Sequence, residues 1–157
     1  MQPNKHLSFM SFAAILLSTQ AMADSDLIFY EGNGCSQDIV FAYNSHAFAN
    51  DNCKSKGACK GNNDEARSLR ILKSVKNGAR IYVYDDPKAN ETDDWTKITI
   101  TDSSFIPPEG YCLRTFENNF LNPGENFGIR VEYIQKNGLD GKISRVRVFP
   151  NPTDAIN

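Results

Sequence analysis

The stretch NDEARSLRI at residues 63–71 aligns without gaps with the stretch DGKISRVRV at residues 140–148. Both begin with an acid or amide, carry a serine at the fifth or sixth place, and end in an apolar-Arg-apolar pattern. Each also follows an aromatic segment that opens a hairpin, IFYEG at residues 28–32 and IYVYDD at residues 81–86. Similarity repeated in this way predicts a duplicated structural unit.

Short segments rich in β-branched and aromatic residues surround these two stretches and predict strands. The alternation is clearest in the segment that ends at residue 134, where Phe127, Ile129, Val131 and Tyr133 fall on one side. We expect that side to face the core. The predicted strands span residues 27–31, 38–43, 68–72, 79–85, 96–101, 110–116, 127–134 and 143–149.

Turn-forming residues separate the predicted strands, as in Lys76-Asn77-Gly78 and Lys136-Asn137-Gly138. No segment predicts a helix longer than a turn or two, so the pattern favours an antiparallel sandwich. Residues 44–63 form the one long polar stretch and are expected to be a loop held by covalent links.

The two hairpins and the two related stretches resemble the βγ-crystallin superfamily. Its domains contain two Greek-key motifs, each opening with a Tyr-Glu or Tyr-Asp hairpin and closing with a hexapeptide of the form Asn/Asp, Asn/Asp, any, any, Ser/Thr, Ser. The resemblance implies an all-β Greek-key β-sandwich over residues 24–157. Motif one would cover about residues 26–75 and motif two about residues 76–149.

The resemblance also implies calcium, bound between the motifs by oxygen ligands from one motif and the fifth-position hydroxyl of the other. Matched residue by residue, it gives one candidate site from the side chain of Asp64, the carbonyl groups of Glu65 and Asp85, and the hydroxyl of Ser144. Calcium needs six to eight oxygens, so one hexapeptide alone does not suffice.

The second candidate site is expected to be disabled. Gly141 stands where an acid or amide is needed, and Arg67 stands where the hydroxyl is needed. A guanidinium cannot bind a cation, and we expect Arg67 to pair with Asp140 or Glu31 instead. An alternative is that both hexapeptides are plain arches, in which Asp64 and Asp140 bond local backbone N–H groups.

The N-terminus predicts a secretory signal peptide over residues 1–23. Lys5 precedes an apolar run from Phe9 to Leu17, and the small-residue frame Ala21-Met22-Ala23 precedes Asp24. The run is far shorter than the ~20 apolar residues of a membrane span, so no membrane span is expected. A secreted or periplasmic location follows.

Four cysteines in an exported chain predict two disulfides. They are Cys35, Cys53, Cys59 and Cys112, and they allow three pairings between which the sequence does not choose. Spacing gives a weak preference for Cys53 with Cys59 and Cys35 with Cys112. Zinc is the competing interpretation, but the cysteines lack the two tight ligand pairs that structural zinc sites prefer.

The charge balance of 17 Lys and Arg against 19 Asp and Glu disfavours a nucleic-acid partner. His46 is the one histidine after residue 23, and no nucleophile motif accompanies it. The acid pairs at residues 85–86 and 93–94 are expected to be solvated surface. We therefore expect no enzymatic activity and no catalytic residue. Trp95 is either a core anchor or a stacking surface for a protein or carbohydrate partner.

The sequence therefore predicts an exported, non-enzymatic, disulfide-stapled protein, in which one structural calcium ion and plain arches without an ion are alternatives. The alternative function is a secreted inhibitor or toxin that acts through an exposed, disulfide-stapled loop.

Overall fold

The computed structural model describes residues 24–119 and 127–150. The predicted signal peptide lies outside the described residues. Within the described ranges, no helix has the length and apolar character needed to cross a membrane.

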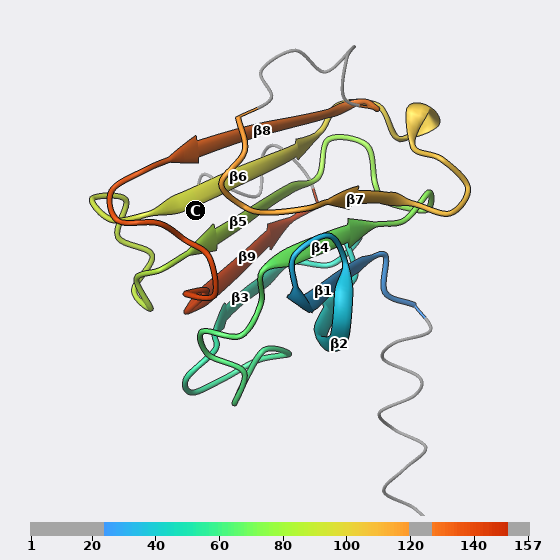
Figure 1. Cartoon of the computed structure of the whole chain (residues 1–157). Coiled ribbons are helices and arrows are strands. Elements are labelled where there is room, and N and C mark those ends of the chain that lie inside the picture. The colour runs from blue at the N-terminus through green and yellow to red at the C-terminus, as the bar shows by residue number, and fades with distance from the viewer. Residues whose placement is uncertain (1–23, 120–126, 151–157) are drawn as a thin grey trace, which may run out of the picture.

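The described chain is built from strands with one short 3-10 helix (Figure 1). All eight predicted strands are present, with ends shifted by a few residues, and a ninth strand joins them. The elements are β1 (Leu27–Gly32), β2 (Ser36–Tyr43), β3 (Ala49–Asn52), β4 (Ser68–Ile71), β5 (Arg80–Tyr84), β6 (Trp95–Ile100), η1 (Ser103–Phe105), β7 (Tyr111–Leu113), β8 (Ile129–Ile134) and β9 (Arg145–Phe149).

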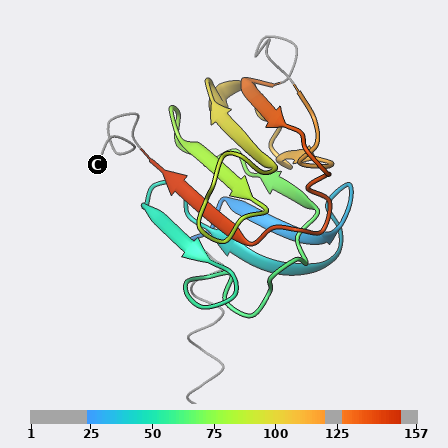
Figure 2. The ribbon, with the colours of Figure 1, turned by 90° about the vertical axis from the view of Figure 1, so that its left-hand side faces the viewer.

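The strands form two antiparallel sheets in an open sandwich. One sheet has the order β2-β1-β4-β7, and the other has the order β3-β9-β5-β6-β8 (Figure 2). Each sheet takes one strand from the opposite half of the chain. β3 belongs to the first half but pairs with β9, and β7 belongs to the second half but pairs with β4.

The core lies between the sheets. Alternate residues of every long strand point into it, because successive side chains of a strand face opposite sides of the sheet. Phe29 packs on Phe41 and on Phe116, with ring centroids 4.7 and 5.9 Å apart. From the facing sheet come fully buried aliphatic side chains, among them Ile81, Val83, Ile98, Ile129, Val131, Val146 and Val148.

Three expectations need correction. Residues 44–63 are not free of regular structure, because β3 forms there from the polar sequence ANDN. This edge strand forms because it pairs with β9, although its residues have low strand propensity. Phe127 is 48% exposed and not in the core, because the strand begins two residues later. Trp95 lies on the outward side of its strand, so it is not a core anchor.

Two disulfides join Cys35 to Cys112 and Cys53 to Cys59, which is the pairing that spacing favoured. The first links the β1–β2 turn of one half to strand β7 of the other. The second closes a small loop whose two sulfur-bearing residues are fully buried, while Lys54, Lys56 and their neighbours between them are exposed.

Candidate metal centre

The two related stretches form matching arches. Asp64 and Gly141, which occupy the same place in the alignment, both adopt left-handed backbone, with φ values of 64° and 65°. The N–H of Arg67 donates to the carbonyl of Tyr30 at 2.9 Å, and the N–H of Ser144 donates to the carbonyl of Tyr84 at 2.8 Å. Each arch therefore joins the aromatic hairpin of its own half in the same way.

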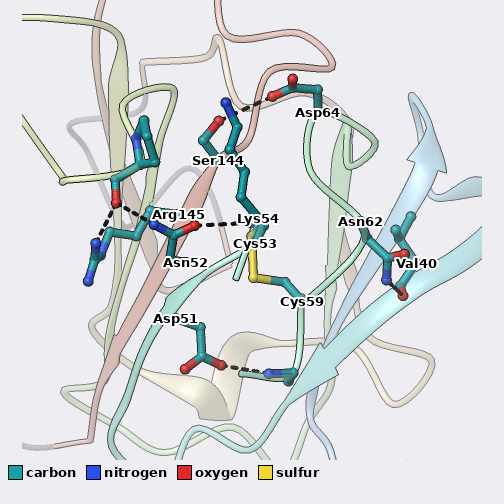
Figure 3. Close-up of a disulfide and its surroundings, with 12 residues drawn as sticks. Val40, Asp51, Asn52, Cys53, Lys54, Cys59, Asn62, Asp64, Ser144 and Arg145 are labelled. Carbon is teal, nitrogen blue, oxygen red and sulfur yellow. Dashed lines mark hydrogen bonds between the residues drawn. A yellow bond between two sulfur atoms is a disulfide. The ribbon is translucent and has the colours of Figure 1, made fainter. Parts of the chain in front are cut away.

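The arches meet through the two side chains predicted to share a cation. The Ser144 hydroxyl donates to Asp64 Oδ1 at 3.2 Å, although the residues are 80 positions apart (Figure 3). The N–H of Asp64 also donates to the carbonyl of Ile143 at 3.1 Å. Ser144 is buried and Asp64 is exposed, so the pair lies at the surface with the hydroxyl on its inner side.

The loop closed by the Cys53–Cys59 disulfide is hydrogen-bonded to the second arch at Ser144. The N–H of Cys53 donates to the carbonyl of Ser144 at 2.9 Å, and the Cys53–Cys59 disulfide lies next to it in Figure 3. At the other end of the loop, Asn62 donates through its side chain to the carbonyl of Val40 at 2.8 Å. The loop is therefore tied to both sheets.

Glu65 and Asp85 complete the predicted set. The Glu65 carbonyl accepts from Arg67 Nη1 at 3.0 Å, which uses one of its two lone pairs. Burial and then the neighbouring carboxylate of Asp93 raise the pKa of Asp85, with Asp64 a smaller cause in the same direction. Lys142 acts in the opposite sense. The negative charge of Asp64 in the first arch therefore contributes to the raised pKa of Asp85.

A second group of carboxylates surrounds Asp85. Asp85, Asp93 and Asp94 each have an oxygen within 4.8 Å of the others, so these three residues could hold a metal ion. From the sequence we expected all three carboxylates to be solvated surface, and only Asp85, through its backbone carbonyl, was assigned to a calcium site. Their closeness follows from the β5–β6 hairpin, in which the N–H of Asp85 donates to the carbonyl of Asp94 at 3.0 Å. Residues that flank a hairpin necessarily face each other, and this was the available signal.

Asp94 is the structural member of that group. Its fully buried carboxylate accepts hydrogen bonds from the Tyr133 hydroxyl and from the N–H groups of Lys136, Asn137 and Gly138, at 2.8–3.2 Å. Burial alone would raise its pKa, but the N–H groups of Asn137 and Lys136 hold the pKa of Asp94 below its usual value. Asp94 therefore fixes the turn after β8.

The second predicted site contains a cation of the protein itself. Arg67 Nε lies 3.8 Å from Asp140 Oδ1, and Arg67 Nη1 donates to the backbone carbonyl of Glu31 at 3.0 Å. Both predicted partners are therefore found, with Glu31 contributing its carbonyl and not its carboxylate. A Cβ atom at Gly141 would lie 2.6 Å from Arg67 Nη2, so the guanidinium also needs the glycine there.

His46 does not activate the serine beside it. The Ser45 hydroxyl is buried and donates to Asp26 Oδ2 at 2.6 Å, while it accepts from the N–H of Lys76 at 2.8 Å. His46 Nε2 lies 3.1 Å from the Ser74 carbonyl and 3.8 Å from Asp26 Oδ2. The hydroxyl proton is directed to the carboxylate, so this trio is not arranged for nucleophilic attack.

Comparison with protein-family models, with curated proteins and with solved structures gives no match. These comparisons assign the chain to no family. The architecture and the geometry of the arches are thus the basis for a functional proposal.

Proposed function

We propose that this chain is an exported, non-enzymatic protein of the βγ-crystallin type that binds one calcium ion to stabilise its fold. The two disulfides support export, because such bonds persist in oxidising compartments. The order of strands supports two Greek-key motifs. In each half the last strand returns to pair with the first, β4 with β1 and β9 with β5.

The observation that carries the calcium proposal is the contact between Asp64 Oδ1 and Ser144 Oγ. The N–H of Ser144 also donates to the carbonyl of Tyr84, the residue before Asp85. Carboxylate, hydroxyl and carbonyl oxygens are the ligands that calcium prefers. Asp64, Ser144 and the carbonyl groups of Glu65 and Asp85 would hold the ion, and water would supply the remaining ligands. A bound divalent cation would also relieve the mutual repulsion of Asp64, Asp85 and Asp93.

Calcium should therefore raise the thermal midpoint of the oxidised protein. Binding to the native state alone stabilises it by RT ln(1 + [Ca]/Kd), which is about 2.7 kcal/mol at a free concentration of about 100 times Kd. We expect the midpoint to rise by several degrees between chelator and saturating calcium. Differential scanning calorimetry with calcium, magnesium and chelator measures this rise.

Substitutions then locate the ion. Asp64→Asn and Ser144→Ala should each reduce the calcium-dependent rise in the midpoint. The control Asp140→Asn, at the second predicted site where Arg67 takes the place of the ion, should leave that rise unchanged. If millimolar calcium moves no midpoint, the calcium proposal fails. If Asp93→Asn removes the rise while Asp64→Asn keeps it, the ion belongs to the hairpin carboxylates and the arch assignment is wrong.

One observation favours an inhibitor or toxin as the second candidate. Residues 54–58 are all exposed, while Cys53 and Cys59 at their ends are fully buried, so the loop projects from a rigid base. Replacing residues 54–58 with a Gly-Ser segment of equal length tests this candidate in protease and growth-inhibition assays. Loss of inhibition with an unchanged melting midpoint would favour it over the calcium proposal.

A further inference from the structure

The outer face of the five-stranded sheet concentrates positive charge. Strand register places Lys97, Tyr82 and Arg147 in one cross-strand row and Arg130 and Arg80 in the adjacent row. Together with Arg145, five cationic side chains of the strands point outward here, and Glu132 is the one acid among the outward strand residues of this face. We call the surface formed by Arg80, Lys97, Arg130, Glu132, Arg145 and Arg147 the cationic face.

The cationic face contrasts with the chain as a whole, whose net charge is -2. Its charges are crowded enough to affect one another. Burial and then the neighbouring Arg147 lower the pKa of Arg145. Glu132 pairs with Lys97 at 3.1 Å and with Arg130 at 3.4 Å, so it offsets only part of the positive charge. The surface therefore suits an anionic partner, which the overall composition conceals.

Arg145 and Arg147 are held in place before any partner binds. Arg145 Nη1 donates to the carbonyl of Pro87, and Arg145 Nε donates to Asn50 Oδ1 at 3.0 Å. Arg147 Nε reaches the same Asn50 oxygen at 3.3 Å, and its guanidinium lies 5.5 Å from the centre of the Tyr84 ring. Side chains fixed in this way lose less conformational entropy when they bind a ligand.

Aromatic rings lie among these charges. The rings of Tyr82, Tyr84 and Trp95 lie 6.2–6.3 Å from one another, with ring planes 8–25° apart. Tyr84 is buried, but Tyr82 and Trp95 are partly exposed. Within the described ranges, the buried Trp95 Nε1 has no hydrogen-bond partner. The surface thus offers the ring faces of Tyr82 and Trp95 next to cations.

We propose that the cationic face binds an anionic polysaccharide. Its carboxylate or sulfate groups would pair with Arg80, Lys97 and Arg147, and its sugar rings would pack on Tyr82 and Trp95. A polysaccharide with one carboxylate per sugar suits this surface better than a more densely charged chain such as a nucleic acid, because Glu132 lies within the face and the carboxylates of Asp85 and Asp93 lie at the hairpin end of β5 and β6. The arch contact of Asp64 and Ser144 contributes nothing to this face, so the inference is independent of calcium binding.

The test uses the full oxidised protein in chelator, so that calcium cannot bridge protein and sugar. Isothermal titration with heparin, a sulfated polysaccharide, and with polygalacturonate, a carboxylated one, should show binding that weakens as salt rises. Neutral dextran should not bind. The more strongly bound of the two acidic chains identifies the preferred acidic group.

Variants connect binding to the face. The triple variant Arg80→Gln, Lys97→Gln, Arg147→Gln should weaken binding about tenfold or more, and Trp95→Ala should weaken it about fivefold. The matched control is Arg70→Gln. Arg70 occupies the place of Arg147 in the other repeat and lies 5.8 Å from the Tyr30 ring, but it belongs to the opposite sheet. Arg70→Gln should change the affinity less than twofold.

Several outcomes overturn the proposal. Equal binding of dextran would show that charge is not recognised, and no binding of either acidic polysaccharide at low salt would remove the site. Tighter binding of a single-stranded oligonucleotide or of polyglutamate would assign the face to a different class of partner. Unchanged affinity in a triple variant that melts like the parent protein would show that these cations take no part.

Discussion

Replacing both Cys35 and Cys112 with alanine should destabilise the protein by about 4 kcal/mol. The bond joins residues 77 positions apart, and in the chain-entropy model a closed loop of that length strongly restricts the unfolded state. It also fixes β7, which has only three residues and pairs with β4 alone, to the β1–β2 turn. A loss of this size is a large part of the stability of a small domain.

The double variant Cys53→Ala, Cys59→Ala is the comparison. Its loop spans only 6 positions, so the same model gives a loss of about 2 kcal/mol. Urea unfolding at pH 7 measures both values. If the short-loop variant loses more stability than the long-loop variant, packing of the fully buried Cys53 and Cys59 outweighs loop entropy, and our ranking is wrong.

Asp94→Ala should cost about 3 kcal/mol, because it leaves four buried or half-buried donors without their acceptor. The hydrogen bonds lost are those of the Tyr133 hydroxyl and of the backbone N–H groups in the turn at residues 136–138. Glu91→Ala in the same β5–β6 loop is the control. Glu91 is exposed, so its removal should change the unfolding free energy by less than about 0.5 kcal/mol.

The contribution of Asp94 should depend on pH. Its pKa in the folded protein lies below the usual value of 3.8, so its stabilising effect is complete above that value and is lost as pH falls through the lower folded pKa. The difference in unfolding free energy between the parent and Asp94→Ala should therefore be constant from pH 7 to about 5 and should shrink below about pH 4. A constant difference down to pH 2 would contradict this account.

The repeat and the strand pattern were readable from the sequence because each depends on local residues. Alternation at Ile129, Val131 and Tyr133 identified a core face, and the spacing of the four cysteines favoured the pairing that is found. The family resemblance, matched to the aligned stretches, implied that Asp64 and Ser144 are neighbours and suggested the partners of Arg67.

The features that were missed depend on contacts between distant segments. The sequence ANDN of β3 has no strand propensity, and its pairing with β9 across nearly one hundred positions creates the strand. Nothing in the local sequence of Asp94 distinguishes it from a surface acid, because its hydrogen-bond donors lie in the distant turn after β8. The cationic face needed the register of four strands before scattered arginines became one surface.

The placement of β3 and β7 in each other's sheets means that neither half of this chain is self-sufficient. Cleaved near residue 75, the first fragment would lack β7, one of the two neighbours of β4, and the second would lack β3, one of the two neighbours of β9. Once the Cys35–Cys112 disulfide between them is reduced, the two pieces should separate, and they should reassemble when mixed, as in fragment complementation. A molecule whose halves opened during folding would have an equally good partner in a second copy, so domain-swapped dimers are the expected misassembly product of this topology.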